Sequence, residues 1–131
     1  MIPQCLDQGA GILPWSPLAR GLLAGTRRAT GERLTTRART GPFLDSLYRP
    51  ELDSPVIERA VEVAAKRGVS AARVALAWLL HKPDVTAPIV GATKSEHVDD
   101  ALAAEELSLS DDEIARLEKP YVPHPVSGIE L

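Results

Sequence analysis

Cysteine, aromatic residues and long apolar runs are scarce in this chain of 131 residues. The single cysteine, Cys5, has no partner for an internal disulfide, and nothing marks the chain for an oxidising compartment. No run approaches the roughly 18 consecutive apolar residues of a membrane helix, and the N-terminus lacks the charged and apolar regions of a signal peptide. We therefore expect a cytoplasmic protein with no membrane partner.

The rest of the composition, 44% hydrophobic and 25% charged residues, is typical of a globular chain with at most one domain. Residues 1–49 contain seven arginines and three acidic residues, whereas residues 50–131 contain eight basic and fifteen acidic residues. The basic segment favours an anion site in the N-terminal part of the chain, and a solvated arginine-rich loop is the alternative. Nucleic acid is not the expected partner, because only Phe43 and Tyr48 interleave with the arginines and the net charge is −3.

Two short apolar segments bounded by turn residues, 11–15 and 86–91, are typical of buried strands. Helical patterns precede, separate and follow them. The first pattern ends near residue 8. The other four start at Ser54, Ser70, Ser95 and Ser110, and they stop, in the same order, before Gly68, before Pro83, at about Glu105 and before Pro120. Residues 26–53 show no periodicity and are expected to form a long loop, and residues 122–131 an irregular tail.

Strands separated by helices predict a right-handed parallel arrangement and hence an α/β fold. Parallel sheets are covered on both faces, and two strands alone would expose both edges, so we expect segments 11–15 and 86–91 to belong to a larger sheet. The turns after them, 15–21 and 90–95, contain small residues and free backbone N–H groups at one rim of that sheet. Such a rim is suited to phosphate, and two ordinary turns with hydroxyl caps are the alternative.

Motifs for covalent or metal catalysis are absent from the sequence. It contains no G-x-S-x-G elbow, Walker A lysine or C-x-x-C pair, and His81, His97 and His124 lack metal-ligand spacing. Tyr48 and Tyr121 are candidate proton donors, but a catalytic tyrosine needs an activating neighbour and the sequence shows none. The sequence therefore predicts neither a catalytic residue nor a metal site.

Four segments resemble, in the same order, the C-terminal part of aldo-keto reductases. Residues 11–25 (GILPWSPLARGLLAG) are similar to the family's seventh strand and its loop, and residues 68–80 to its penultimate helical region. Residues 88–94 (PIVGATK) resemble the eighth strand and its loop, and residues 107–114 the start of the final helix. The resemblance implies that residues 1–131 are a partial aldo-keto reductase domain, the C-terminal portion of a TIM (β/α)8 barrel that is incomplete by itself.

The resemblance also implies an oxidoreductase that uses NADP and passes hydride between the nicotinamide and a carbonyl or alcohol. The loop after strand seven would bind the pyrophosphate, and the basic loop 26–53 would fold over the cofactor. The loop after strand eight would bind the adenosine and its 2′-phosphate. His97 and Ala101 stand where the family often has glutamine and asparagine near the adenine, so Ala101 is not expected to hydrogen-bond it. The implied cofactor-binding residues are Ser16, Leu18, Arg20, Gly21, Arg37, Gly91, Ala92, Thr93, Lys94 and His97.

The family's catalytic Asp, Tyr, Lys and His lie on its first four strands, which this sequence does not match. The resemblance therefore implies no catalytic residue in this chain, and a requirement for the N-terminal part of the barrel or for self-association. Two alternatives stay open. One is a non-catalytic module that binds a nucleotide or a partner, and the other is a truncated remnant.

Overall fold

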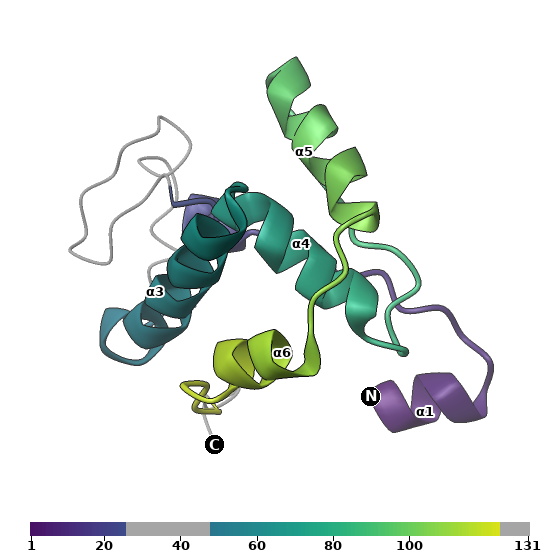
Figure 1. The fold of residues 1–131 in the computed structure, drawn as a ribbon. Helices are drawn as coiled ribbons and strands as arrows, with labels where there is room; N and C mark the ends of the chain where they lie inside the picture. The colour runs from purple at the N-terminus through teal and green to yellow at the C-terminus, as the bar shows by residue number, and fades with distance from the viewer. Residues whose placement is uncertain (26–47, 124–131) are drawn as a thin grey trace.

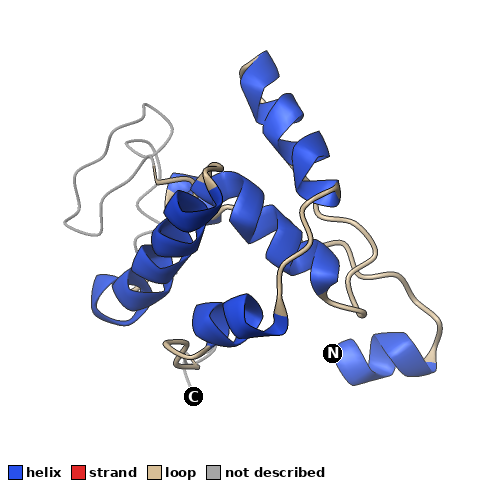
Figure 2. Cartoon of the chain, in the orientation of Figure 1, coloured by secondary structure: helices blue, strands red, loops and turns tan. Residues whose placement is uncertain are grey.

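The computed structural model describes residues 1–25 and 48–123, and within them the regular structure is helical (Figure 1, Figure 2). The helices are α1 (Ile2–Asp7), the short 3-10 helix η1 (Ala19–Gly21), α3 (Pro50–Arg67), α4 (Ala71–His81), α5 (Ser95–Glu105) and α6 (Asp111–Glu118). Helix α4 contacts both α3 and α5, and α6 packs against α3 (Figure 1). Within these ranges, no helix combines the length and apolarity needed to cross a membrane.

The two predicted strand segments lie side by side and parallel, but neither forms a regular strand within the described ranges. Trp15 and Ile89 form an isolated parallel bridge. The Thr86 amide donates to the Ile12 carbonyl at 2.9 Å, and the Ile89 amide donates to the Pro14 carbonyl at 2.9 Å. The predicted parallel pairing is therefore present, whereas the prediction of regular strands is wrong for this part of the chain.

Two features explain why the pairing stays short. Pro14 and Pro88 have no amide hydrogen, so each removes one donor from the ladder. In addition, the described residues supply no second neighbour for either segment. The side chain of Thr86 adds one contact, because its Oγ1 accepts the Ile12 amide at 3.0 Å. The expected α/β architecture is thus not formed by this part of the chain alone, which is mostly helical.

Helix α3 begins at Pro50, upstream of the predicted start at Ser54, so the predicted loop 26–53 extends too far. Pro50 lies in the first turn, where its missing amide hydrogen would have no helical partner. The Asp53 carboxylate accepts the Arg49 amide at 2.7 Å and so satisfies a donor at the start of the helix. The helix therefore starts at Pro50, with Asp53 in its first turn, and the predicted start at Ser54 lies inside it.

The caps predicted at Ser70, Gly68 and Ser110 are confirmed. Ser70 caps α4, since its Oγ accepts the Arg73 amide at 3.1 Å. Gly68 ends α3 in the left-handed conformation, with φ of 65°. Ser110 and Glu113 form the predicted reciprocal capping box of α6, at 2.8 and 3.3 Å. These local signals place α4 and α6 correctly in the sequence.

The main core cluster is built by α3, α4, α6 and the segment just before α6. Val74 of α4 is its most deeply buried member, with no exposed surface. Alanines of α3 and α4 contribute much of the cluster, so these helices approach closely but bury little apolar area per residue. The buried members are Ala60, Val63, Ala64, Val74, Ala77, Leu109 and Leu117.

A separate set of apolar side chains is uncovered. Val98 and Leu102 of α5 are 46% and 63% exposed. Trp15 and Ile89, the bridge residues, are 66% and 55% exposed. Parallel strands are normally covered on both faces, and the two bridged segments lack such cover among the described residues.

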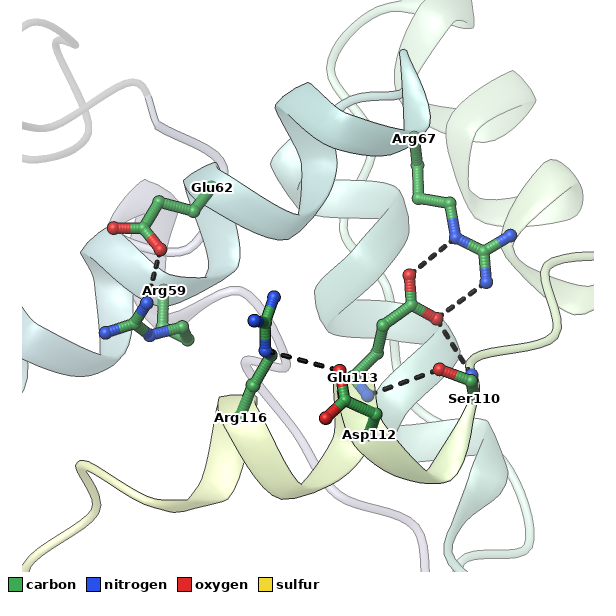
Figure 3. Close-up of polar contacts among 7 residues, drawn as sticks. All are labelled: Arg59, Glu62, Arg67, Ser110, Asp112, Glu113 and Arg116. Atoms are coloured by element: carbon green, nitrogen blue, oxygen red, sulfur yellow. Dashed lines mark hydrogen bonds and ion pairs between the residues drawn. The ribbon is translucent and has the colours of Figure 1, made fainter.

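One ion pair joins α3 to α6. The Arg67 guanidinium donates to both carboxylate oxygens of Glu113 at 2.6 Å and to the Ser108 carbonyl at 3.0 Å. Figure 3 shows the Glu113 carboxylate between Arg67 and Ser110. The hydrogen bonds from Arg67 and from the Ser110 amide lower the pKa of Glu113 to about 2. This contact therefore requires an ionised carboxylate.

We expect acid to weaken this ion pair selectively. Because the pKa of Glu113 is lowered from 4.5 to about 2, its contribution to stability is present above about pH 4.5 and is lost as the pH falls towards 2. The melting temperature of the wild-type chain should exceed that of Glu113→Gln near pH 6, and the difference should shrink as the pH falls. Thermal melts followed by circular dichroism measure this difference.

Asp112→Asn is the matched control for the pH series. The side chain of Asp112 is 80% exposed and pairs with Arg116 of the same helix, so its removal should change the melting temperature little at any pH. A Glu113→Gln difference of the same size near pH 6 and near pH 2 would contradict the role assigned to this carboxylate.

Candidate functional site

The turn that follows the first bridged segment concentrates left-handed backbone. Ser16, Ala19 and Arg20 have φ of 54°, 47° and 54°. Each such non-glycine residue costs roughly 1–2 kcal/mol, and strain of this kind gathers at functional sites. The Ala19 amide donates to the Ser16 carbonyl and the Gly21 amide to the Leu18 carbonyl, both at 2.9 Å, which holds the turn in shape. The strain marks residues 16–21 as a candidate site.

The turn that follows the second bridged segment is exposed and leads into α5. Gly91, Ala92, Thr93 and Lys94 all lie at the surface. Lys94 is the N-cap residue of α5, and no side chain caps the helix there, so the predicted cap at Ser95 is wrong. The sequence pattern misplaces the start of this helix by one position, because Ser95 is already helical.

The His97 side chain accepts a hydrogen bond from the backbone at the start of α5. Its Nδ1 accepts the Thr93 amide at 3.4 Å, a contact that requires Nδ1 to be unprotonated. One of the N–H groups predicted to be free for a ligand is therefore engaged by a side chain. His97 thus lies beside Thr93 and Lys94, as its assignment to the same site requires, and its contact with adenine stays a prediction.

Lys94 is the N-cap residue at the positive end of α5. Within the described ranges, no carboxylate pairs with it. A cation at a helix N-terminus is unfavourable by roughly 0.3–1 kcal/mol, and a bound anion would offset this cost. The charge of Lys94 and the dipole of α5 therefore both favour an anion at this position.

The bridge between Trp15 and Ile89 brings the two turns to one end of the paired segments. Ser16 directly follows Trp15, and Gly91 follows Ile89 after one residue. In a parallel pair, the chains leave at the same edge, so the two turns lie at the same rim. The residues of the first turn are half-buried and those of the second exposed. Arg37, which the resemblance adds to this site, lies outside the described residues.

One further polar contact had no sequence signal. The Trp78 Nε1 donates to Glu118 Oε1 at 3.0 Å, and the Lys82 ammonium pairs with the same carboxylate. The ammonium also lies 4.7 Å from the centre of the Trp78 ring. The hydrogen bonds from Lys82 and Trp78 lower the pKa of Glu118. This contact joins α4 to α6, and it has a structural role.

The described ranges do not bring together the groups that a metal site needs. No three His, Cys, Asp or Glu side chains there could hold a metal ion. The two candidate proton donors also lie outside the two turns: Tyr48 is half-buried ahead of α3, and Tyr121 is 62% exposed after α6. What the turns offer is backbone and positive charge, which suits binding of an anionic group.

Comparison with known proteins gives consistent matches. The family model "Aldo/keto reductase family" matches residues 1–121. The chain is 46% identical over 128 residues to a Schizosaccharomyces pombe protein provisionally named as an aryl-alcohol dehydrogenase, covering 98% of this chain and 35% of that protein. It is 43% identical over 129 residues to the versiconal hemiacetal acetate reductase of Aspergillus parasiticus, covering 96% and 36%. It is 40% identical over 130 residues to an aldo-keto reductase of Fusarium vanettenii, covering 98% and 34%.

These relatives are much longer than this sequence. The chain spans about a third of the length of each protein that it matches. The aligned part contains both turns and helices α3 to α6. The similarity therefore includes the candidate site described above.

Proposed function

Because the chain belongs to the aldo/keto reductase family, we propose that it is the cofactor-binding C-terminal part of an NADP-dependent reductase. The complete activity would be hydride transfer between NADPH and a carbonyl compound or an alcohol. The observation that supports this role best is the arrangement of two candidate anion-binding turns at one end of the bridged segments. In this proposal NADPH supplies the hydride, and this chain supplies contacts to the cofactor.

The two turns would divide the cofactor between them. The strained turn of Ser16, Leu18, Arg20 and Gly21 would bind the pyrophosphate, because closely turned backbone makes a concavity for anions. The second turn would bind the adenosine with its 2′-phosphate, because the Lys94 ammonium and the start of α5 both favour negative charge. Gly91 and Ala92 would let the backbone approach the ligand closely.

We further propose that this chain is part of a TIM barrel and requires the remainder of that barrel. The bridge residues Trp15 and Ile89 are more than half exposed, and the chain spans about a third of its relatives. Neighbouring barrel strands would cover these side chains and extend the short pairing into a sheet. Self-association is the alternative way to cover the same surface, and a module that only binds nucleotide is the alternative function.

The names of the relatives guide the choice of first substrates. One relative is provisionally named as an aryl-alcohol dehydrogenase and another as a reductase of versiconal hemiacetal acetate. We propose aromatic alcohols and the corresponding carbonyl compounds as the substrate class. The residues that select among them would lie mostly on strands outside this sequence, since substrate loops in such barrels come from several strands.

Lys94→Ala tests the cofactor assignment. We expect it to weaken binding of NADPH roughly tenfold to a hundredfold, because a hydrogen bond to a charged group contributes about 1.5–3 kcal/mol. Binding of NADH, which has no 2′-phosphate, should change little. Calorimetric titration of the complete protein, in which the rest of the barrel accompanies this chain, with each dinucleotide measures both effects.

Lys66→Ala is the matched control, because Lys66 is an exposed lysine near the end of α3. It should leave both affinities unchanged. Equal weakening of NADPH and NADH by Lys94→Ala would show that Lys94 does not contact the 2′-phosphate. Failure of either dinucleotide to bind when the N-terminal part of a related reductase is also present would refute the role of this chain as a cofactor-binding part.

A further inference from the structure

A cavity outside the two turns lies between α3 and α6. It is a half-open pocket at the surface, with a volume of about 440 Å³. The described residues that line it are Arg59 of α3, Arg116 of α6, and Lys119 and Pro120 just after α6. Three of these four residues are cations, and they come from two separate elements.

The two arginines retain donors that their ion pairs do not use. Arg59 pairs with Glu62 through Nη1, and Arg116 pairs with Asp112 through Nε at 3.3 Å. A guanidinium carries five N–H donors, so each arginine keeps donors for a further partner. Figure 3 shows Arg116 extending from α6 towards α3, on which Arg59 lies. Two guanidinium groups thus border one cavity.

Lys119 adds a positive charge that the described residues do not neutralise. No carboxylate in ranges 1–25 and 48–123 pairs with its ammonium. The C-terminal end of α6 favours nearby cations, but it corresponds to only about half a negative charge. The cavity therefore combines unused guanidinium donors with an unpaired ammonium.

We propose that this cavity binds a small phosphate or phosphate monoester, separately from the dinucleotide site. Glu62 and Asp112 already pair with the two arginines, so Lys119 supplies the unpaired positive charge. A phosphate group, which carries a charge of roughly −1.5 to −2 at neutral pH, has three acceptor oxygens for the unused guanidinium donors, whereas a carboxylate has two. Planar guanidinium groups also match the geometry of phosphate oxygens. The ligand would connect α3 to α6, at a different place from the Arg67–Glu113 ion pair.

Titration of the isotopically labelled chain with inorganic phosphate at constant ionic strength tests the proposal. Saturable amide shifts are expected at Arg59, Arg116 and Lys119, with weaker or no response to acetate. Lys119→Gln should weaken phosphate binding about threefold to fivefold, as loss of one exposed charge contact does. This variant removes no side-chain hydrogen bond or ion pair within the described ranges, so it should fold normally.

Lys66→Gln removes the same charge from α3, at a residue that does not line the cavity, and should leave the affinity unchanged. Equal weakening by both variants would reduce the effect to non-specific charge attraction and overturn the proposal. Shifts that increase linearly without saturation would also overturn it, and so would saturable shifts confined to Thr93 and Lys94. Because Lys94→Ala reports on the dinucleotide site and Lys119→Gln on the cavity, each proposal can fail without the other.

Discussion

The 131-residue chain, supplied with NADPH and a panel of carbonyl compounds, is expected to give no measurable hydride transfer. Reduction of a carbonyl requires a proton donor held against its oxygen, and the two candidate donors, Tyr48 and Tyr121, lie outside both turns of the candidate site. The rate should lie at least roughly a thousandfold below the 1 per second that is modest for enzymes. The absorbance of NADPH, followed over hours, measures it.

Two comparisons make this expectation decisive. Addition of the N-terminal part of a related reductase should produce activity if the proposed barrel assembles, and no activity if the chain acts only as a binding module. Turnover by the chain alone that is lost in Tyr121→Phe or Tyr48→Phe would show that this sequence carries its own proton donor. That result would overturn the proposed division between cofactor binding and catalysis.

Leu76→Ala is expected to lower the free energy of unfolding by about 2–5 kcal/mol. The Leu76 side chain is 2% exposed, so its removal leaves a cavity that the rigid α4 backbone cannot close. Domains of this size are stable by only about 5–15 kcal/mol, so the loss would remove a large share of the total. Urea titration followed by the fluorescence of Trp78, which packs against the main core cluster, measures the change.

Leu80→Ala is the matched control on the same helix. Its side chain is 38% exposed, so the same truncation should cost much less, about 1 kcal/mol or below. Equal losses in the two variants would show that α4 does not pack as described. Unfolding without a cooperative transition in the wild-type chain would favour the truncated remnant over a stable binding part.

Helix ends were predicted well because their signals are local. Ser70 and Ser110 each bond to an amide three residues ahead, and Gly68 adopts the left-handed conformation that glycine tolerates best. The start of α3 was missed because Asp53 satisfies the Arg49 amide, a contact that allows the helix to begin at Pro50. Local patterns therefore locate helices closely but choose poorly between adjacent starts.

The positions of the two turns were predicted, but their conformation was not. The family resemblance identified both turns, yet nothing in the sequence indicated left-handed backbone at Ala19 and Arg20, which are not glycines. Similarly, the capping of Thr93 by His97 required the geometry of the turn before α5. Backbone strain and side-chain capping depend on how a turn is held by its surroundings, and residue types alone do not specify them.

Residue order and short-range chemistry account for the family, the helices and the positions of both turns, because each depends on neighbours within a few residues or on a recognisable motif. Contacts between distant residues needed the folded chain. The single bridge of Trp15 with Ile89, the joining of Arg67 to Glu113, and the cationic cavity each unite groups separated by many positions. Their formation depends on how helices pack and on which surfaces stay uncovered, and these are properties of the whole arrangement in space.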